Sequence, residues 1–395
     1  MRFILYDFHI IRPQYESIQG DALNWIAQAH AFSKYKENLA QGRRKNIDEY
    51  YELIQKIVLR FACKPEKISK RGSDISDFLH TNWDAMEIFN LNKSASGVLM
   101  HQRMQFFEYK IQNILQILYR DIYHAPQNLI HVTCTGYISP SAPQKLVAER
   151  GWGSFCQVTH AYHMGCYASL PAIRMGKGFL QNEERFLTHL NEKVKKKVDI
   201  IHNELCTLHF NPAAHDPEQI VVQSLFADGH IKYSICEYND YTAIDMQNAF
   251  ELIAEQEILY AESFDAMTWR LSDFGFQMTI SRKVPSIIAE NIEVFLYNLF
   301  EKAGLNFREE KERAIFAIHP GGPKIIEYIR DILNLSAEQI KYSQAILFEY
   351  GNMSSATLPH IWEQISQTKE AIGMLVVSLA FGPGLTMSGS IMRVI

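Results

Sequence analysis

The chain has 395 residues, of which 47% are hydrophobic and 21% charged. This is the composition of a globular protein, and it excludes a disordered or collagen-like chain. At ~150 residues per domain the length predicts two or three domains. The formal net charge of −5 gives no electrostatic footprint for nucleic acid, so we expect no nucleic-acid partner.

The sequence shows no segment typical of secretion or membrane insertion. The apolar stretch before Asp7 is too short for the hydrophobic part of a signal peptide. The apolar stretch from Gly373 to Phe381 falls well short of the ~18 residues needed to span a bilayer. The six cysteines have no paired spacing and are typical of free thiols in a reducing compartment. We therefore expect a cytoplasmic protein without membrane association.

Hydrophobic periodicity predicts an alternation of strands and helices in the first part of the chain. In chain order, we expect a strand at Phe3–Ile11, helices at Asp21–Phe32 and Asp48–Arg60, a basic loop at 63–75, a helical region at Asp84–Tyr123, a strand at Asn128–Thr133, a strand with a loop at Phe155–Tyr162, a helix at Ala168–Leu180 and a strand at Val198–Phe210. The charged stretch Gln181–Lys197 is typical of a solvated surface excursion.

The second part continues the alternation. We expect helices at Ala249–Phe264, Val284–Ala303 and Lys324–Leu333, a further helix opening at 351–357, and strands at Met278–Ile280, Ala314–Ile318, Ala345–Phe348, Leu375–Leu379 and Ile391–Ile395. Such alternation predicts an α/β fold with layered sheets and helices. We place the boundary between an N-terminal half, 1–245, and a C-terminal half, 246–395.

Cys166 lies in the segment His-Met-Gly-Cys-Tyr-Ala-Ser, directly after Gly165. The glycine permits a tight turn, and Leu170, Ile173 and Leu180 then follow on one helical face. This pattern predicts a cysteine at a helix N-terminus, where free N–H groups and the helix dipole favour a thiolate. The alternative is a small buried hydrophobic residue, the common role of a lone cysteine.

Two further polar residues stand on glycine-flanked turns. His319 follows the predicted strand Ala314–Ile318 and precedes Pro-Gly-Gly-Pro, so it is well placed to point into a cleft. Asn352, in Glu-Tyr-Gly-Asn-Met-Ser-Ser, has the form of a helix start. The alternatives are a structural histidine and an N-cap or turn asparagine.

Together the three residues suit thioester chemistry. A thiolate at Cys166 would attack an acyl thioester, while His319 and Asn352 donate hydrogen bonds to a developing oxyanion or enolate. None of these roles needs a metal, and no Cys/His cluster in the sequence has zinc spacing. We therefore expect neither a metal nor a resident cofactor.

Several segments resemble one family. HMGCYAS, IHPGGP, EYGNMSSAT and FGPGLT, in that order, resemble the chalcone synthase-like type III polyketide synthases, and FADG at 226–229 resembles that family's LFGDG segment. Further similar segments are Cys134-Thr135-Gly136, Val284-Pro285 and Met392-Arg393. The resemblance runs from about residue 60 to the end of the chain. It implies a thiolase fold, layered αβαβα with two similar halves, and a homodimer.

The resemblance also implies the reaction. Cys166 would be the acylated nucleophile, with His319 and Asn352 assisting malonyl decarboxylation and holding the thioester carbonyl. The substrates would be an acyl-CoA starter and malonyl-CoA, joined by decarboxylative Claisen condensation. Whether coenzyme A or an acyl carrier protein delivers the chains stays open.

The pocket positions depart from the plant members of the family. The family's first gatekeeper phenylalanine falls on Phe226, whereas the second falls on Met278, and Phe276 on the same strand face is a candidate for the missing ring. Two small cavity positions carry His209 and Val222, both larger than in the plant enzymes. We therefore expect few extensions and a pyrone or a single aromatic ring. The other expected pocket residues are Thr135, Ser354, Gly382 and Pro383.

Lys67, Lys70 and Arg71 form the most compact basic cluster between residues 60 and 100. The family places its coenzyme A-binding cations in this neighbourhood, so the three are candidates for the phosphates of coenzyme A. The alternative is a solvated surface loop.

Three other functions fit the sequence less well. A degradative thiolase would need a second cysteine in its C-terminal glycine loop, but the last cysteine is Cys236 and the loop 381–384 reads FGPG. A ketoacyl-carrier-protein synthase III-like enzyme shares the Cys/His/Asn set and is the main alternative. Such enzymes are usually shorter and carry a glycine-only final loop, so Pro383 and the length favour the polyketide synthase. A non-catalytic scaffold is disfavoured while all three polar residues are present.

Overall fold

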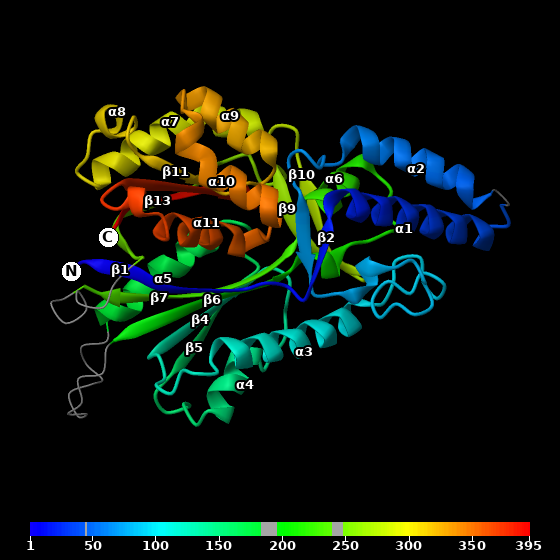
Figure 1. Ribbon diagram of the computed structural model, residues 1–395, viewed down its shortest axis with the longest axis horizontal. Coiled ribbons are helices and arrows are strands. Elements are labelled where there is room, and N and C mark those ends of the chain that lie inside the picture. Colours follow the sequence, from blue (N-terminus) through cyan, green and yellow to red (C-terminus); the bar gives the residue numbers. More distant parts are fainter. Residues whose placement is uncertain (44–45, 183–195, 239–247) are drawn as a thin grey trace.

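The computed structural model of the protein describes residues 1–43, 46–182, 196–238 and 248–395. Its main feature is a nine-stranded mixed sheet with the order β11–β12–β13–β8–β1–β7–β6–β4–β5 (Figure 1). The strands are β1 (Phe3–Ile11), β4 (Asn128–Thr133), β5 (Gln157–Tyr162), β6 (Lys197–Leu205), β7 (Asp228–Glu237), β8 (Phe250–Leu259), β11 (Ile315–Ile318), β12 (Leu375–Gly382) and β13 (Thr386–Val394).

The sheet contains one pairing pattern twice. In the first half β4 pairs parallel with β6, β6 pairs antiparallel with β7, and β7 pairs antiparallel with β1. In the second half β11 pairs parallel with β12, β12 pairs antiparallel with β13, and β13 pairs antiparallel with β8. A short antiparallel contact between β1 and β8 joins the two halves. This repetition is the layered architecture of two similar halves that the sequence predicts.

Helices cover the strands in three layers. The middle layer contains α5 (Ser169–Asn182) and α11 (Thr357–Ser366), which contact strands of both halves and bury a shared apolar core. One outer layer contains α3 (Met100–Leu118) and α4 (Ala142–Glu149), and the other contains α7 (Val284–Lys302), α8 (Phe307–Glu310), α9 (Pro323–Leu333) and α10 (Ala337–Tyr350) (Figure 1). The turns that connect these strands to the middle-layer helices lie between the layers, and the candidate site described below is formed at these turns.

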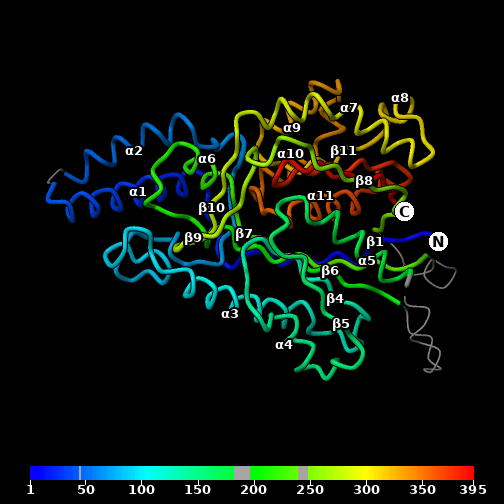
Figure 2. Tube along the Cα trace, turned by 180° about the vertical axis from the view of Figure 1, so that it is seen from behind, coloured from blue at the N-terminus to red at the C-terminus, as the bar shows by residue number. Residues whose placement is uncertain are grey.

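A smaller group of elements extends from one end of the molecule. It contains α1 (Gln19–Ala40), α2 (Ile47–Phe61) and α6 (Pro217–Leu225), with the hairpin β9 (Met267–Ser272) and β10 (Gly275–Ile280) beside α6 in both views (Figures 1 and 2). A second two-stranded sheet pairs β2 (Tyr15–Ile18) with β3 (Lys70–Ser73). The β9–β10 hairpin forms a sheet of its own, separate from the nine-stranded one.

Three sequence-based element predictions are wrong. Residues 249–264 contain the strand β8, in which Phe250, Leu252 and Ala254 are buried and alternate with more exposed residues. Residues 345–348 lie within helix α10, because a short apolar run does not distinguish a buried strand from a buried helix face. The predicted helical region 84–123 is helical only over α3.

Two predictions lie mainly outside the described residues. These are the charged excursion 181–197 and the boundary between residues 245 and 246. Among the described residues, no helix has the length and apolarity needed to cross a bilayer.

Candidate active site

Cys166 lies in a tight turn between β5 and α5. Gly165 adopts a φ of +92°, and a Cβ atom there would approach the Pro383 Cδ to 2.4 Å. Only glycine fits this left-handed position against the proline. Helix α5 begins at Ser169, so Cys166 precedes the helix rather than occupying its first turn. The sequence-based prediction put Cys166 at the N-terminus of the helix, and the structure corrects this: the helix begins three residues later.

The Cys166 thiol is buried, with 5% of the residue exposed. It donates a weak hydrogen bond to the Ser354 hydroxyl at 3.8 Å. Burial raises the pKa of Cys166 to about 12, because a thiolate loses its hydration in the interior. This burial opposes the thiolate that a helix N-terminus would favour.

His319 follows β11 as predicted, and its backbone N–H donates to the carbonyl of Leu379 at 2.8 Å. The side chain is buried, yet neither ring nitrogen has a protein partner. Burial lowers the pKa of His319 to about 3, so the ring is neutral, with one N–H donor and one acceptor nitrogen. Two unpartnered nitrogens in a buried ring indicate a group prepared for a ligand.

Asn352 is held by both its backbone and its side chain. Its N–H donates to Leu225 and its carbonyl accepts from Ala227, each at 2.9 Å, so it forms a β-bridge with Phe226. The side-chain Oδ1 accepts the Ser354 N–H at 2.9 Å. This contact fixes the amide so that Nδ2, which is buried and unpartnered, remains free to donate. The Oδ1 contact with the Ser354 N–H is that of a turn asparagine, one of the expected alternatives, whereas α11 begins only at Thr357; Asn352 also lines a cavity beside Cys166.

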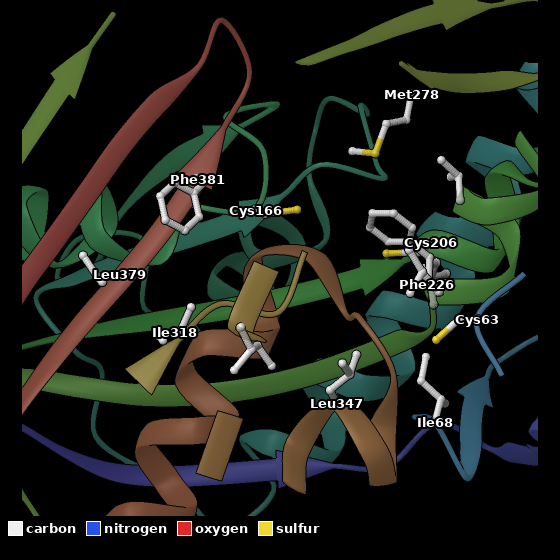
Figure 3. Packing of buried hydrophobic residues seen from close by; sticks show 14 of the residues in the cluster. Cys63, Ile68, Cys166, Cys206, Phe226, Met278, Ile318, Leu347, Leu379 and Phe381 are labelled. Atoms are coloured by element: carbon white, nitrogen blue, oxygen red, sulfur yellow. The ribbon is translucent and has the colours of Figure 1, made fainter. Parts of the chain in front are cut away.

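The three side chains line one cavity of about 50 Å3, called here the second cavity. Its other walls are apolar and include Ile280, Val284, Ile288, Ile325 and Phe381. Figure 3 shows Cys166 between Phe381 on one side and Phe226 with Met278 on the other. The structure therefore brings together the cysteine, histidine and asparagine that the sequence singled out from three separate turns.

A cavity of about 30 Å3, called here the first cavity, lies on the other side of the thiol. It contains the predicted pocket residues Thr135, His209, Val222, Phe276, Ser354 and Pro383. The two cavities share Cys166, Phe226, Met267 and Met278. Phe226 and Met278 thus lie between the two spaces, where the resemblance placed the gatekeepers, and Met267 joins them.

Two predicted pocket residues are placed differently. Phe276 lines the first cavity but not the second, and its ring centroid lies 4.7 Å from that of His209. It therefore forms a wall of the first cavity and does not replace the missing gatekeeper ring. Gly382 lines neither cavity. A Cβ atom there would approach the Tyr167 ring to 2.1 Å, so this glycine permits close packing rather than substrate contact.

The three basic residues proposed for coenzyme A do not form one open patch. Arg71 is 5% exposed, and its guanidinium donates to Gln19 and to the carbonyls of Gln223 and Phe226. It is a structural residue, so its assignment to phosphate binding is corrected. Lys67 pairs with Glu327 at 2.6 Å, and Lys70 pairs with Glu16 at 3.1 Å. A phosphate-binding role for these two lysines stays a prediction.

Sequence reasoning missed two residues of the site. Trp269 lines the first cavity from β9, and the alternation Met267, Trp269, Leu271 before a turn is the hairpin signal that could have located it. Glu204 is buried behind the site and accepts hydrogen bonds from the Cys134 N–H and the Thr135 hydroxyl, each at 2.9 Å. Burial raises its pKa. No local pattern marks Glu204, which is the penultimate residue of β6.

Among the described residues, no group of three or more His, Cys, Asp or Glu side chains could hold a metal ion. The donors in the second cavity are nitrogen atoms of an imidazole and an amide beside a thiol. They suit the carbonyl oxygen of a thioester or its enolate.

Comparisons with known proteins agree with this geometry. Residues 251–395 match the family model "Chalcone and stilbene synthases, C-terminal domain". The chain is 28% identical over 269 residues to "Probable polyketide synthase 1" of Dictyostelium discoideum, covering 67% of this chain and 8% of that protein. It is also 28% identical over 272 residues to "Putative chalcone synthase" of Bacillus subtilis (strain 168), covering 67% of this chain and 69% of the relative.

The fold is shared over the full chain. The crystal structure of the C-terminal type III polyketide synthase domain of Steely1, a type I/III hybrid from Dictyostelium, superposes with a TM-score of 0.80 and 21% identity, covering 100% of both chains. At this identity the likeness establishes the fold alone. The C-terminal part of the chain thus matches the chalcone and stilbene synthase model, and the whole chain shares the fold of a type III polyketide synthase domain and is similar in sequence to proteins named as polyketide and chalcone synthases.

Proposed function

We propose that the protein condenses malonyl-CoA onto an acyl starter bound to Cys166, makes few extensions, and releases a pyrone or a single aromatic ring. The observation that carries this proposal is the second cavity, in which buried nitrogens of His319 and Asn352 have no protein partner and share the walls with the Cys166 thiol. Such donors stabilise negative charge that develops on a thioester oxygen.

Loading transfers the starter from coenzyme A to the cysteine. A ring nitrogen of neutral His319 accepts the thiol proton while Cys166 Sγ attacks the thioester carbonyl, and the Asn352 Nδ2 donates to the carbonyl oxygen. The bond between the carbonyl carbon and the coenzyme A sulfur then breaks. The proton returns from His319 to that sulfur, and free coenzyme A leaves. Burial disfavours the charged forms of both side chains, which supports this order of events.

Condensation uses the same donors. The bond between the malonyl α-carbon and its carboxylate breaks, carbon dioxide leaves, and the electron pair remains as an enolate. The His319 N–H and the Asn352 Nδ2 donate to the enolate oxygen. The α-carbon attacks the acyl group on Cys166, whose carbon–sulfur bond breaks to give a thiolate and a β-ketoacyl-CoA. Transfer of this product back to the cysteine permits the next extension.

The limited number of extensions is supported by the size of the first cavity. Its volume of about 30 Å3 holds only two or three water-sized groups. His209 and Val222, the enlarged positions, both line it. Packed interiors resist enlargement by a growing chain, although the methionines at the mouth of the cavity are adaptable.

We propose a homodimer with acyl-CoA and malonyl-CoA as its ligands.

The test is a panel of acyl-CoA starters incubated with malonyl-CoA, with products and protein adducts identified by mass spectrometry. The wild type should release ketide products and carry an acyl adduct on Cys166. Cys166→Ala should form neither. An adduct that survives this substitution would overturn the assignment. A single condensation that requires carrier-protein-bound chains would favour a ketoacyl synthase III-like enzyme instead.

A further inference from the structure

The walls of the first cavity combine apolar side chains with polar groups that are already occupied. His209 donates through Nε2 to the Thr135 carbonyl at 2.8 Å and accepts the Phe276 N–H through Nδ1 at 3.1 Å. Burial lowers the pKa of His209 to about 3, so its single proton is committed to this carbonyl. The imidazole therefore links two walls of the cavity and has no donor left for a ligand.

The other nitrogen donors of the first cavity are occupied in the same way. The Trp269 Nε1 donates to the Cys134 carbonyl at 2.6 Å, and the Gln219 Nε2 donates to the Met278 carbonyl at 2.7 Å. The Gln223 Nε2 donates to the Asn211 carbonyl at 3.2 Å. The hydroxyl of Thr135 donates to Glu204 at 2.9 Å. A hydroxyl group deep in the pocket would therefore compete with the protein acceptors that these donors already have.

Trp269 is the largest side chain of this lining. Its indole N–H donates to the Cys134 carbonyl at 2.6 Å, and its backbone carbonyl accepts a hydrogen bond from the His163 ring at 3.0 Å. Its ring centroid lies 5.6 Å from that of Phe276 and 5.9 Å from that of His209. These contacts hold the indole against the cavity instead of letting it swing outward. Trp269 belongs to the β9–β10 hairpin, which also provides Met267, Phe276 and Met278.

We propose that the first cavity selects a short, unsubstituted aliphatic acyl group and that Trp269 sets the length it accepts. This inference rests on the proposed function, since it names the class of starter that Cys166 would carry. The small volume excludes long chains, and the occupied donors disfavour hydroxylated ones. A ligand that adds a methylene beyond the available space, or a hydroxyl without a partner, loads more slowly.

The proposal is tested by the rate at which Cys166 acquires an acyl group, measured by intact-protein mass spectrometry without malonyl-CoA. The probes are acetyl-, butyryl-, hexanoyl-, octanoyl- and 3-hydroxybutyryl-CoA. The wild type should load butyryl at least about tenfold faster than octanoyl, and about tenfold faster than 3-hydroxybutyryl. Equal rates across the series would overturn the proposal.

Three variants separate the indole's role from a general loss of structure. Trp269→Ala should raise octanoyl loading about tenfold while butyryl loading changes little. Trp269→Phe keeps a ring and should retain most of the preference for short chains. Leu271→Ala changes a 69% exposed residue on the same strand and should load like the wild type. A Trp269→Ala protein with unchanged selectivity would contradict the role of Trp269.

Should Trp269→Ala fail to fold, Val222→Gly enlarges the same cavity from α6 and should shift loading in the same direction. A second measurement adds malonyl-CoA and follows ketide products. Selective loading without any condensation would leave this inference standing and refute the proposed function. Condensation with no selectivity among the starters would refute this inference and leave the proposed function standing.

Discussion

Buried nitrogens without partners are costly for a fold, and in the second cavity they belong to His319 and Asn352. The Asn352 amide is oriented by a contact unrelated to any ligand, because its Oδ1 is taken by the Ser354 N–H. Its Nδ2 is thus aimed into the cavity before substrate arrives. This preorganisation is what gives such donors a large effect on rate.

Asn352→Ala should therefore reduce condensation about 10²–10³-fold while the starter still loads on Cys166. Asn352→Asp is the matched control for the fold, since it keeps an oxygen for the Ser354 N–H but replaces the free donor. It should melt close to the wild type and condense poorly. Single-turnover loading and steady-state product formation measure the two steps, and wild-type condensation by Asn352→Ala would refute the role.

Gly165 sets the position of the nucleophile. Gly165→Ala adds a Cβ at a φ of +92° and 2.4 Å from the Pro383 Cδ. Such strain should lower the free energy of unfolding by about 1–3 kcal/mol and displace Cys166, slowing its acylation. Gly178→Ala in α5, where a Cβ would have no heavy atom within 4 Å, should leave stability unchanged or raise it. Urea unfolding compares the two, and equal effects would contradict the argument.

At the level of elements, β3 supports the position of Phe226, which lies between the two cavities. Arg71 of β3 donates to the carbonyls of Gln223 and Phe226 at the C-terminal end of α6, each at 2.7 Å. Arg71→Met should lower the free energy of unfolding by about 2–4 kcal/mol, because buried carbonyls lose a charged donor. Lys70→Met, next to it in an exposed ion pair, should change stability by less than about 1 kcal/mol. Thermal unfolding of both variants checks this difference.

The elements also show why sequence reasoning located the proposed catalytic residues better than their surroundings. Cys166, His319 and Asn352 each follow or precede a glycine turn at an element end, a pattern visible in the letters. The burial of Arg71 depends on Gln19 and Gln223, which are far apart in sequence and meet only in the fold. Strand β8 is rich in Glu, Ala, Gln and Leu, which favour helices locally, and its pairing with β13 overrides that preference.

On the scale of the whole molecule, several histidines are buried in the neutral form. Burial lowers the pKa to about 3 at His30, His131, His209, His319 and His360. In the unfolded chain these groups titrate near 6.5. Below that pH the unfolded state binds protons on these rings and the folded state does not, so the free energy of unfolding falls as the pH falls.

We expect the free energy of unfolding to be steady above pH 7 and to fall below pH 6.5, by at most about 1.4 kcal/mol per histidine for each pH unit. Asp228, Glu204 and Glu363 act in the opposite sense, because burial raises their pKa values, to about 7 for Asp228, and favours their protonated forms in the fold. Three carboxyls do not offset five imidazoles. Urea unfolding at pH 8, 7, 6 and 5.5 measures the slope, and a flat profile would show that these rings accept protons without unfolding.

The β9–β10 hairpin forms a sheet of its own, and this separation has a consequence for how the sequence of the protein can vary. The hairpin provides Met267, Trp269, Phe276 and Met278 to the cavity walls, yet its strands pair only with each other. Cys166, His319 and Asn352 are positioned by other parts of the chain, at the ends of the nine-stranded sheet and its helices. Mutations in the hairpin can therefore reshape the cavity walls while the strand pairing of the nine-stranded sheet stays as it is.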